Sequence, residues 1–215
     1  MHKKLAVLFG GVLLCACATY KPEGGVKEAV AANDTQALAY FAKHKKIDQP
    51  INERGETWLL SNSRACNPEY TGILLEAGAN PNAADKYGFT PLISAAMGHE
   101  KTCAQTVQAL LASGADVNLP NADGWTPLMM AVRLNRLETA KALLAAGADI
   151  HATDANGNSA LLHAVLWNHP SCVKLLLNAG ADPNTENNGV TALMAAQKRG
   201  FSKISKLLTQ AGAKK

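Results

Sequence analysis

A short phrase returns along this chain at a nearly constant interval, and it limits the folds that the chain can adopt. In each copy a Thr or Ser is followed two residues later by Leu, and a Gly-Ala pair comes 21 to 24 residues after the opening residue. The openers, separated by 33, 36, 33 and 32 residues, are Thr57, Thr90, Thr126, Ser159 and Thr191. A period near 33 predicts a solenoid of stacked units. The longer interval indicates a three-residue insertion between Thr90 and Gly114.

Each unit carries the sequence signals of two helices and a turn. The Thr126 hydroxyl can cap a helix, and Pro127 suits the first helical position, where its missing N–H would have had no partner. A second helix is expected from Leu137 to Ala145, and Gly147 can take the left-handed conformation that ends it. Asp123-Gly124 supplies the positive φ of a tight turn between units. One unit cannot bury its apolar face alone, so the fold depends on stacking.

Two segments of the third unit carry a family resemblance. Asp123 to Leu128 (DGWTPL) and Ala145 to Ile150 (AAGADI) are similar to the signature of the ankyrin repeat family, and the likeness extends over residues 52 to 212. The resemblance implies an all-α solenoid of helix-turn-helix units with projecting β-hairpin-like turns. It also implies five ankyrin repeats at residues 52–215, the last acting as a C-terminal cap, preceded by an N-terminal helical cap at residues 26–51.

The N-terminus and two of the repeats depart from this pattern. Val26 to Ala32 and Thr35 to His44 predict two short amphipathic helices around Asn33-Asp34, which suits a cap with a polar outer face. Thr57-Trp58 and Ser159-Ala160 stand where Thr-Pro is usual. We therefore expect the first helices of repeats 1 and 4 to be less firmly capped.

The first residues have the composition of an export signal. A short basic start precedes an apolar run from Leu5 to Leu14, which is too short to span a bilayer as a permanent helix. Residues 1–17 are interpreted as a lipobox-type signal peptide with Cys17 as the lipidated first mature residue, and residues 18–25 as a tether. Cleavage after Ala18 by ordinary signal peptidase is the alternative. By analogy with lipoproteins, we expect a periplasmic protein anchored to the outer membrane.

Composition agrees with a single elongated domain after export. Of the 215 residues, 47% are hydrophobic and 18% are charged, which suffices for a continuous core. Removal of Lys3 and Lys4 with the leader would lower the formal net charge from +4 to +2, which is too mild for a nucleic-acid partner, since that needs a concentrated basic face. We expect a monomer that contacts a membrane only through its N-terminal lipid.

Three cysteines follow the leader, and an oxidising compartment would allow two of them to pair. Cys66 and Cys103 are expected in the inter-helix turns of repeats 1 and 2. Packed helices lie about 8–10 Å apart, whereas a disulfide needs Cα atoms within about 7 Å. The insertion before Cys103 could close that gap, so we predict a Cys66–Cys103 disulfide, with two free thiols as the alternative. Cys172 is interpreted as a small buried apolar residue.

No motif of an enzyme or a metal site occurs in the sequence. It contains no Gly-x-Ser-x-Gly elbow, Walker loop or His-Glu-x-x-His. His163, His169 and Cys172 are the densest reactive group, but tetrahedral zinc needs a fourth, converging ligand. Carboxylates such as Asp85 and Asp154 recur at turns and are interpreted as turn formers. We therefore predict a non-enzymatic chain with no catalytic residue, metal or cofactor.

Function should then lie on the surface that ankyrin-like arrays present, the projecting turns and the exposed ends of the first helices. The turn aromatics that could anchor a partner are Tyr87, Phe89 and Trp125. The first helices are expected to add a basic concave stripe made of Arg64, Arg133, Leu134, Trp167, Lys198 and Arg199. This surface predicts a protein–protein interaction module in the bacterial envelope, binding a partner with an acidic surface. The alternative is a dedicated inhibitor or immunity protein that neutralises a periplasmic toxin or hydrolase.

Overall fold

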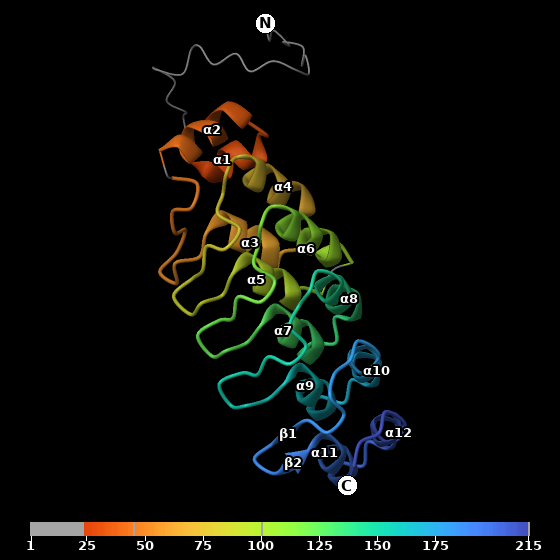
Figure 1. Cartoon of the computed structure of the whole chain (residues 1–215). Coiled ribbons are helices and arrows are strands. Elements are labelled where there is room, and N and C mark those ends of the chain that lie inside the picture. The colour runs from red at the N-terminus through yellow and green to blue at the C-terminus, as the bar shows by residue number, and fades with distance from the viewer. Residues whose placement is uncertain (1–23, 45, 100, 215) are drawn as a thin grey trace, which may run out of the picture.

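The chain folds into two parallel rows of helices (Figure 1). A computed structural model describes residues 24–44, 46–99 and 101–214. The first helices of the five repeats are α3 (Trp58–Arg64), α5 (Pro91–Met97), α7 (Pro127–Arg133), α9 (Ala160–Leu166) and α11 (Ala192–Lys198). The second helices are α4 (Pro68–Glu76), α6 (Cys103–Ala112), α8 (Leu137–Ala145), α10 (Pro170–Asn178) and α12 (Ser202–Gln210). The predicted solenoid of helix-turn-helix units is confirmed.

One more helix pair stands at the N-terminal end. It comprises α1 (Val26–Ala31) and α2 (Thr35–Lys43), and α1 contacts α4. Asn33 between them has φ 50°, close to the φ of 57° at Asn135, which joins the helices of repeat 3. This pair therefore has the same helix-turn-helix geometry as the repeats. The interpreted leader at residues 1–17, its Cys17, and the tether as far as residue 23 lie outside the described residues.

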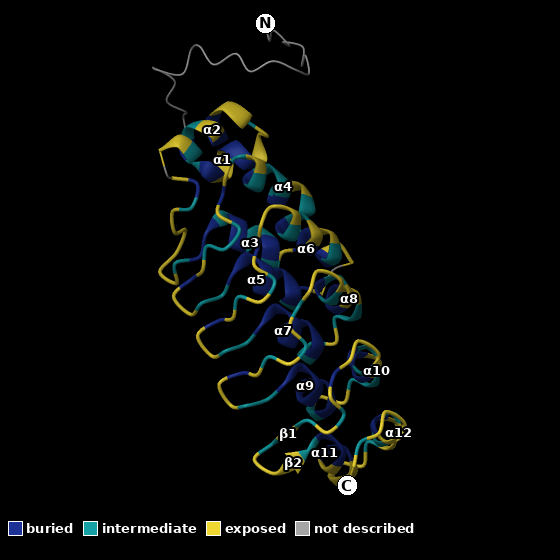
Figure 2. Ribbon diagram, in the orientation of Figure 1, coloured by how far each residue is buried: buried dark blue, intermediate teal, exposed yellow. Residues whose placement is uncertain are grey.

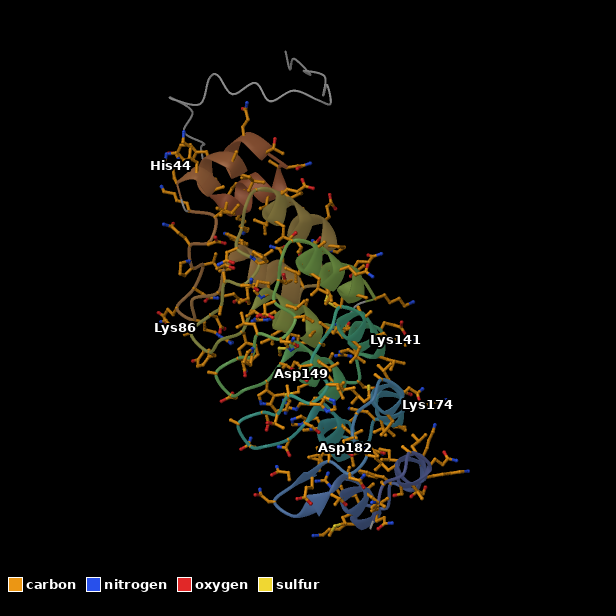
Figure 3. All side chains as sticks on the ribbon, viewed as in Figure 1. His44, Lys86, Lys141, Asp149, Lys174 and Asp182 are labelled. Atoms are coloured by element: carbon orange, nitrogen blue, oxygen red, sulfur yellow. A yellow bond between two sulfur atoms is a disulfide. The ribbon has the colours of Figure 1, made fainter. Side chains whose placement is uncertain are left out.

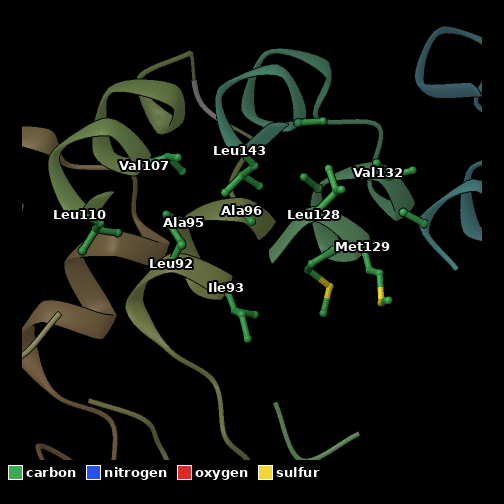
Figure 4. Packing of buried hydrophobic residues seen from close by; sticks show 14 of the residues in the cluster. Leu92, Ile93, Ala95, Ala96, Val107, Leu110, Leu128, Met129, Val132 and Leu143 are labelled. Atoms are coloured by element: carbon green, nitrogen blue, oxygen red, sulfur yellow. The ribbon is translucent and has the colours of Figure 1, made fainter. Parts of the chain in front are cut away.

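A continuous apolar strip holds the two rows together. Each first helix packs on the next first helix, and each second helix on the next second helix. The leucines two residues after the openers, at most 2% exposed, are Leu59, Leu92, Leu128, Leu161 and Leu193. Figure 4 shows Leu92 of α5 and Leu128 of α7 in this core, and Figure 2 shows the buried strip running along the first helices. Burying each leucine contributes about 2 kcal/mol, so neighbouring repeats stabilise one another.

Every first helix begins with the same side-chain cap. The opener's hydroxyl accepts a hydrogen bond from the N–H three residues later in all five repeats, at 3.1 to 3.3 Å. The distances are 3.2 Å for Thr57 and 3.3 Å for both Ser159 and Thr126. The expectation of weaker capping in repeats 1 and 4 was therefore wrong for this bond. The opener's hydroxyl is sufficient for this hydrogen bond. Repeats 1 and 4 lack only the proline at the first helical position.

The projecting turns are built by side chains that accept backbone hydrogen bonds. In each of the first four turns, one side-chain oxygen of an Asn or Asp accepts hydrogen bonds from two backbone N–H groups. These residues are Asn52, Asp85, Asn121 and Asp154. Neighbouring turns are joined by backbone bonds, such as the one from Ala155 N to Asp123 O at 2.9 Å. Within the described residues, strands occur only in the last turn, where β1 (Glu186–Asn187) pairs antiparallel with β2 (Val190–Thr191).

Candidate binding surface

An aromatic and cationic cluster lies where repeats 3 and 4 meet. The Arg133 guanidinium, at the end of α7, lies 4.9 Å from the ring centroids of both Trp125 and Trp167. Trp125 belongs to the turn before α7, and Trp167 follows the last residue of α9. Trp125 packs partly against the core, whereas Trp167 is 52% exposed. Cation–π contacts of this kind contribute about 0.5–1 kcal/mol each at exposed sites. They hold one exposed indole ring and one cation in a defined arrangement.

A buried hydrogen bond between His163 and Asp154 supports the position of Trp125. Nε2 of His163 lies 3.0 Å from Oδ2 of Asp154, and both side chains are at most 5% exposed. The His163 ring also lies against Trp125, with 4.2 Å between ring centroids. Since Asp154 builds the turn with its other oxygen, one carboxylate links the turn to the helix. The pair therefore sets the position of the indole that contacts Arg133.

The protein shifts the pKa of both members of this pair. Burial lowers the pKa of His163 and outweighs the Asp154 carboxylate, which acts in the opposite direction. Burial alone would raise the pKa of Asp154, but hydrogen bonds from Asn158 N, His163 and Asn156 N together lower it. Near neutral pH, Nε2–H of an uncharged His163 then donates to the carboxylate. No partner for its buried Nδ1 occurs in the part of the chain that the structure describes.

The chain should lose stability as the pH falls below 6.5, in part because of His163. Its folded-state pKa lies below the reference value of 6.5, so the unfolded chain takes up this proton first. The contribution of His163 to the free energy of unfolding is therefore fully present above pH 6.5 and decreases below it. Asp154, whose pKa is also lowered, adds a loss only below its reference value of 3.8. Thermal midpoints measured at pH 7.5 and 5.5 separate the contribution of His163 from that of Asp154.

Repeat 3 provides a matched variant for this measurement. Asn121 and Met130 occupy the positions of Asp154 and His163 there, 33 residues earlier. The double variant Asp154→Asn, His163→Met copies a pair that the fold already accommodates, so its midpoint should fall less between pH 7.5 and 5.5. A fall as large as that of the wild type would show that another group controls this range.

The remaining predicted aromatic and apolar residues divide into two groups. Tyr87, at the tip of the repeat 2 turn, is 55% exposed, and Arg54 lies over its ring at 5.1 Å. Phe89 and Leu134 are partly buried and pack against the core. Tyr87 therefore joins Trp167 as an accessible ring, while Phe89 and Leu134 serve mainly to support the array.

The predicted basic stripe is not uniform along the array. Nη1 of Arg64 lies 3.0 Å from Oε1 of Glu56, whose side chain is only 10% exposed, so that charge is balanced. The Arg133 guanidinium lies between two indoles. Lys198 and Arg199 are exposed, and Arg199 donates from Nη1 to Leu166 O at 2.8 Å. The accessible positive charge is consequently concentrated toward repeat 5.

Two of the cysteines form a disulfide across repeats 1 and 2. Cys66 and Cys103 are bonded, with 4.6 Å between their Cα atoms. Cys66 lies in the inter-helix turn with a left-handed φ of 52°. Cys103 is the first residue of α6, not a turn residue as expected, because the inserted loop fills the turn. A Cβ added to Gly98 would overlap both sulfur atoms, so this loop closes tightly over the disulfide.

The three residues weighed as metal ligands have separate partners. His163 is paired with Asp154, and His169 Nε2 lies 2.9 Å from Arg133 O. Burial raises the pKa of Cys172 to about 11, and its thiol donates to Asn135 Oδ1 at 3.4 Å. Among the described residues, no group of three or more His, Cys, Asp or Glu side chains could hold a metal ion. None of the helices described is long and apolar enough to cross a bilayer.

Sequence reasoning missed Arg54 and the partner of His163. Nη2 of Arg54 lies 3.2 Å from Oδ2 of Asp85, so Arg54 links turns 1 and 2. A signal for both was present in the repeat register. Asp85 and Asp154 lie five residues before their openers, and His163 lies four residues after its own. Comparing equivalent positions across the repeats could have indicated that these groups meet.

Stacked helix pairs with projecting turns and exposed aromatic rings define a repeat-protein binding module. A family model described as ankyrin repeats (3 copies) matches residues 26–120, 63–154 and 146–215. The chain belongs to the ankyrin repeat family, whose members are generally non-enzymatic modules that bind other proteins. The first match begins at residue 26, inside the segment interpreted as the N-terminal cap.

Similar proteins come from bacteria and from eukaryotes. The human neurogenic locus notch homolog protein 4 is 41% identical over 80 residues, covering 37% of this chain and 4% of that protein. Protein PhlB of Serratia liquefaciens is 38% identical over 115 residues, covering 52% of this chain and 48% of PhlB. The chain thus spans less than half the length of either. A crystal structure of an ankyrin repeat domain from Acinetobacter baumannii AYE is 34% identical with a TM-score of 0.74, covering 87% of this chain and 97% of that one.

Proposed function

We propose that this chain is an exported protein of the bacterial cell envelope that binds a partner protein through its turns and the exposed ends of its first helices. The cluster of Trp125, Arg133 and Trp167 carries the proposal. Trp167 is 52% exposed yet lies against a cation, so ordering it in a complex costs little side-chain entropy. Tyr87, held beside Arg54, offers a second ring on the turn of repeat 2.

The charge of this surface favours an acidic partner. Arg133 is only partly buried between its two rings, and Lys198 and Arg199 continue the positive charge toward the C-terminal repeat. Aromatic and arginine side chains are the types that dominate binding energy in protein interfaces. Charge complementarity around them would speed association and select the partner.

Arg133→Glu combined with Trp167→Ala should reduce partner capture by about tenfold or more. The experiment is crosslinking and pull-down from the envelope fraction, with captured proteins quantified by mass spectrometry. Lys174→Glu is the matched control, since Lys174 lies on α10 in the row of second helices, away from the cluster (Figure 3). Thermal midpoints check that all variants are folded. If the double variant recovers the same proteins as the wild type, this surface is not the binding site.

The same pull-down separates a scaffold from an inhibitor. A scaffold should recover several proteins with moderate affinity, whereas an inhibitor should recover one enzyme and suppress its activity when the two are mixed. Both would use the same exposed rings.

The envelope location draws on two independent features. Disulfides persist in the periplasm and are rare in the cytosol, and this chain contains the Cys66–Cys103 disulfide. The sequence also begins with the pattern of an export signal.

Cys17→Ser should abolish labelling by a fatty-acid probe and release the protein from membranes. Cleavage after Ala18 would instead give an unlabelled protein starting at Thr19, which mass spectrometry of the mature N-terminus detects. An intact leader on protein recovered from the cytosol would contradict export.

A further inference from the structure

In repeat 5 an apolar residue is exposed at a position that is buried in repeats 1 to 4. The residues equivalent to Met194 in repeats 1 to 4, at most 3% exposed, are Leu60, Ile93, Met129 and Leu162. They are buried because the first helix of the next repeat packs beside them. Met194 on α11 is 45% exposed, and Val190 on β2, four residues earlier, is also 45% exposed. Two apolar side chains are thus accessible at this end of the array.

The second helix of the same repeat presents polar residues at this end. Val107, Ala140 and Val173 are fully buried on the second helices of repeats 2 to 4, and the equivalent residue of α12 is Ser205. Thr209 likewise stands where α10 has Leu177. The Thr209 hydroxyl donates to Ser205 O at 2.9 Å, whereas the Ser205 hydroxyl would need a partner if another stacked repeat buried it. The apolar part of this end face thus lies on β2 and α11, and these are the elements that a ligand with an apolar side chain would cover.

The charge around the exposed position indicates the chemistry of that ligand. Residues 186–214 contain one carboxylate, Glu186, and the five basic residues Lys198, Arg199, Lys203, Lys206 and Lys214. Lys198 follows Met194 by four residues on α11 and so lies on the same helix face. Two copies of the chain meeting at this end would bring like charges together. An acidic ligand would instead pair with them.

We propose that Val190, Met194 and Lys198, here called the end strip, dock an acidic segment of a partner protein. An apolar side chain of the segment covers Met194 and Val190, while its carboxylates pair with Lys198 and Arg199. The end strip belongs to repeat 5, whereas the cluster of Trp125, Arg133 and Trp167 belongs to repeats 3 and 4. The proposal goes beyond the proposed function and shares with it the role of a protein-binding module and the basic residues Lys198 and Arg199.

Selection of a random 12-residue peptide library against the full chain tests this proposal. The enriched peptides should combine several Asp or Glu residues with a large apolar residue. Fluorescence anisotropy with synthetic copies should show about a tenfold loss of affinity for Met194→Gln and again for Lys198→Glu. Affinity for the wild type should also fall as salt is raised. Met194→Gln keeps a good helix former at an exposed site, so its thermal midpoint should not change.

Matched controls distinguish binding at the end strip from binding at the cluster of Trp125, Arg133 and Trp167. Lys174→Glu makes the same charge reversal on α10 in the row of second helices, and Tyr87→Gln removes an exposed ring on the turn of repeat 2. Neither should alter peptide affinity. Arg133→Glu with Trp167→Ala should also bind the selected peptides normally, even if it loses envelope partners. The two proposals can therefore fail independently.

Four results would overturn the end-strip proposal. The library could yield no enriched peptide, or only basic or uncharged ones. The selected peptides could bind Met194→Gln as tightly as the wild type. Sedimentation could reveal a dimer of the chain that Met194→Gln dissociates, which would make a second copy the occupant.

Discussion

Replacing Cys66 with Asn and Cys103 with Ala should lower the free energy of unfolding by about 2–4 kcal/mol. The disulfide joins residues 37 positions apart and so restricts a long segment of the unfolded chain. Asn suits position 66 because Asn135 and Asn168 adopt φ of 57° and 55° in the same turn of repeats 3 and 4. The variant therefore removes the covalent bond while keeping the left-handed turn.

Urea unfolding with and without reductant measures this effect. Reductant should destabilise the wild type to about the level of the double variant and leave the variant unchanged. Cys172→Ala is the control for loss of a buried thiol, since Cys172 is buried and not disulfide-bonded. A wild-type midpoint that reductant does not move would mean that the bond is absent from the purified protein or does not stabilise it.

Gly124→Ala should lower the free energy of unfolding by about 2–3 kcal/mol, the second largest effect. Gly124 has φ 79°, and the left-handed conformation costs a residue with a Cβ about 1–2 kcal/mol. An added Cβ would also lie 2.8 Å from Ala155 N in the next turn. The two turns would have to separate and weaken the bond from Ala155 N to Asp123 O, which contributes about 1 kcal/mol.

The last repeat contains the matched control for this substitution. Gly189 occupies the equivalent turn position with φ 74°, but nothing lies within 4 Å of its added Cβ. Gly189→Ala should therefore show only the conformational cost of about 1–2 kcal/mol. Thermal and urea unfolding of the two variants give the difference. Equal losses would show that contact between turns does not contribute.

Much of the fold could be predicted because its determinants are local. Thr126 and Pro127 start α7 through a bond to the N–H three residues away, and α8 spans the predicted Leu137–Ala145. Gly147 ends that unit with a φ of 87°. Such signals involve neighbours in sequence, so they recur with the period of the repeat.

The candidate site was only partly predictable, because its contacts join different repeats. Arg133 and Trp167 were both expected on the binding surface, but their mutual contact joins α7 to the residue that follows α9. Arg64 had the same sequence signal as Arg133, yet Glu56 balances its charge. Residue type and spacing do not reveal which charge has a partner.

By itself, the sequence determined the repeat period, the starts of the first helices and the turn residues, because each depends on hydrogen bonds and backbone conformations within a few residues. Only the tertiary structure decided which side chains stay accessible. Met129 and Met194 are the same residue type at equivalent positions, but repeat 4 packs over Met129, which is 1% exposed, whereas Met194 in repeat 5 is 45% exposed. Burial and charge pairing depend on what stacks against each residue, which is a property of the assembled array.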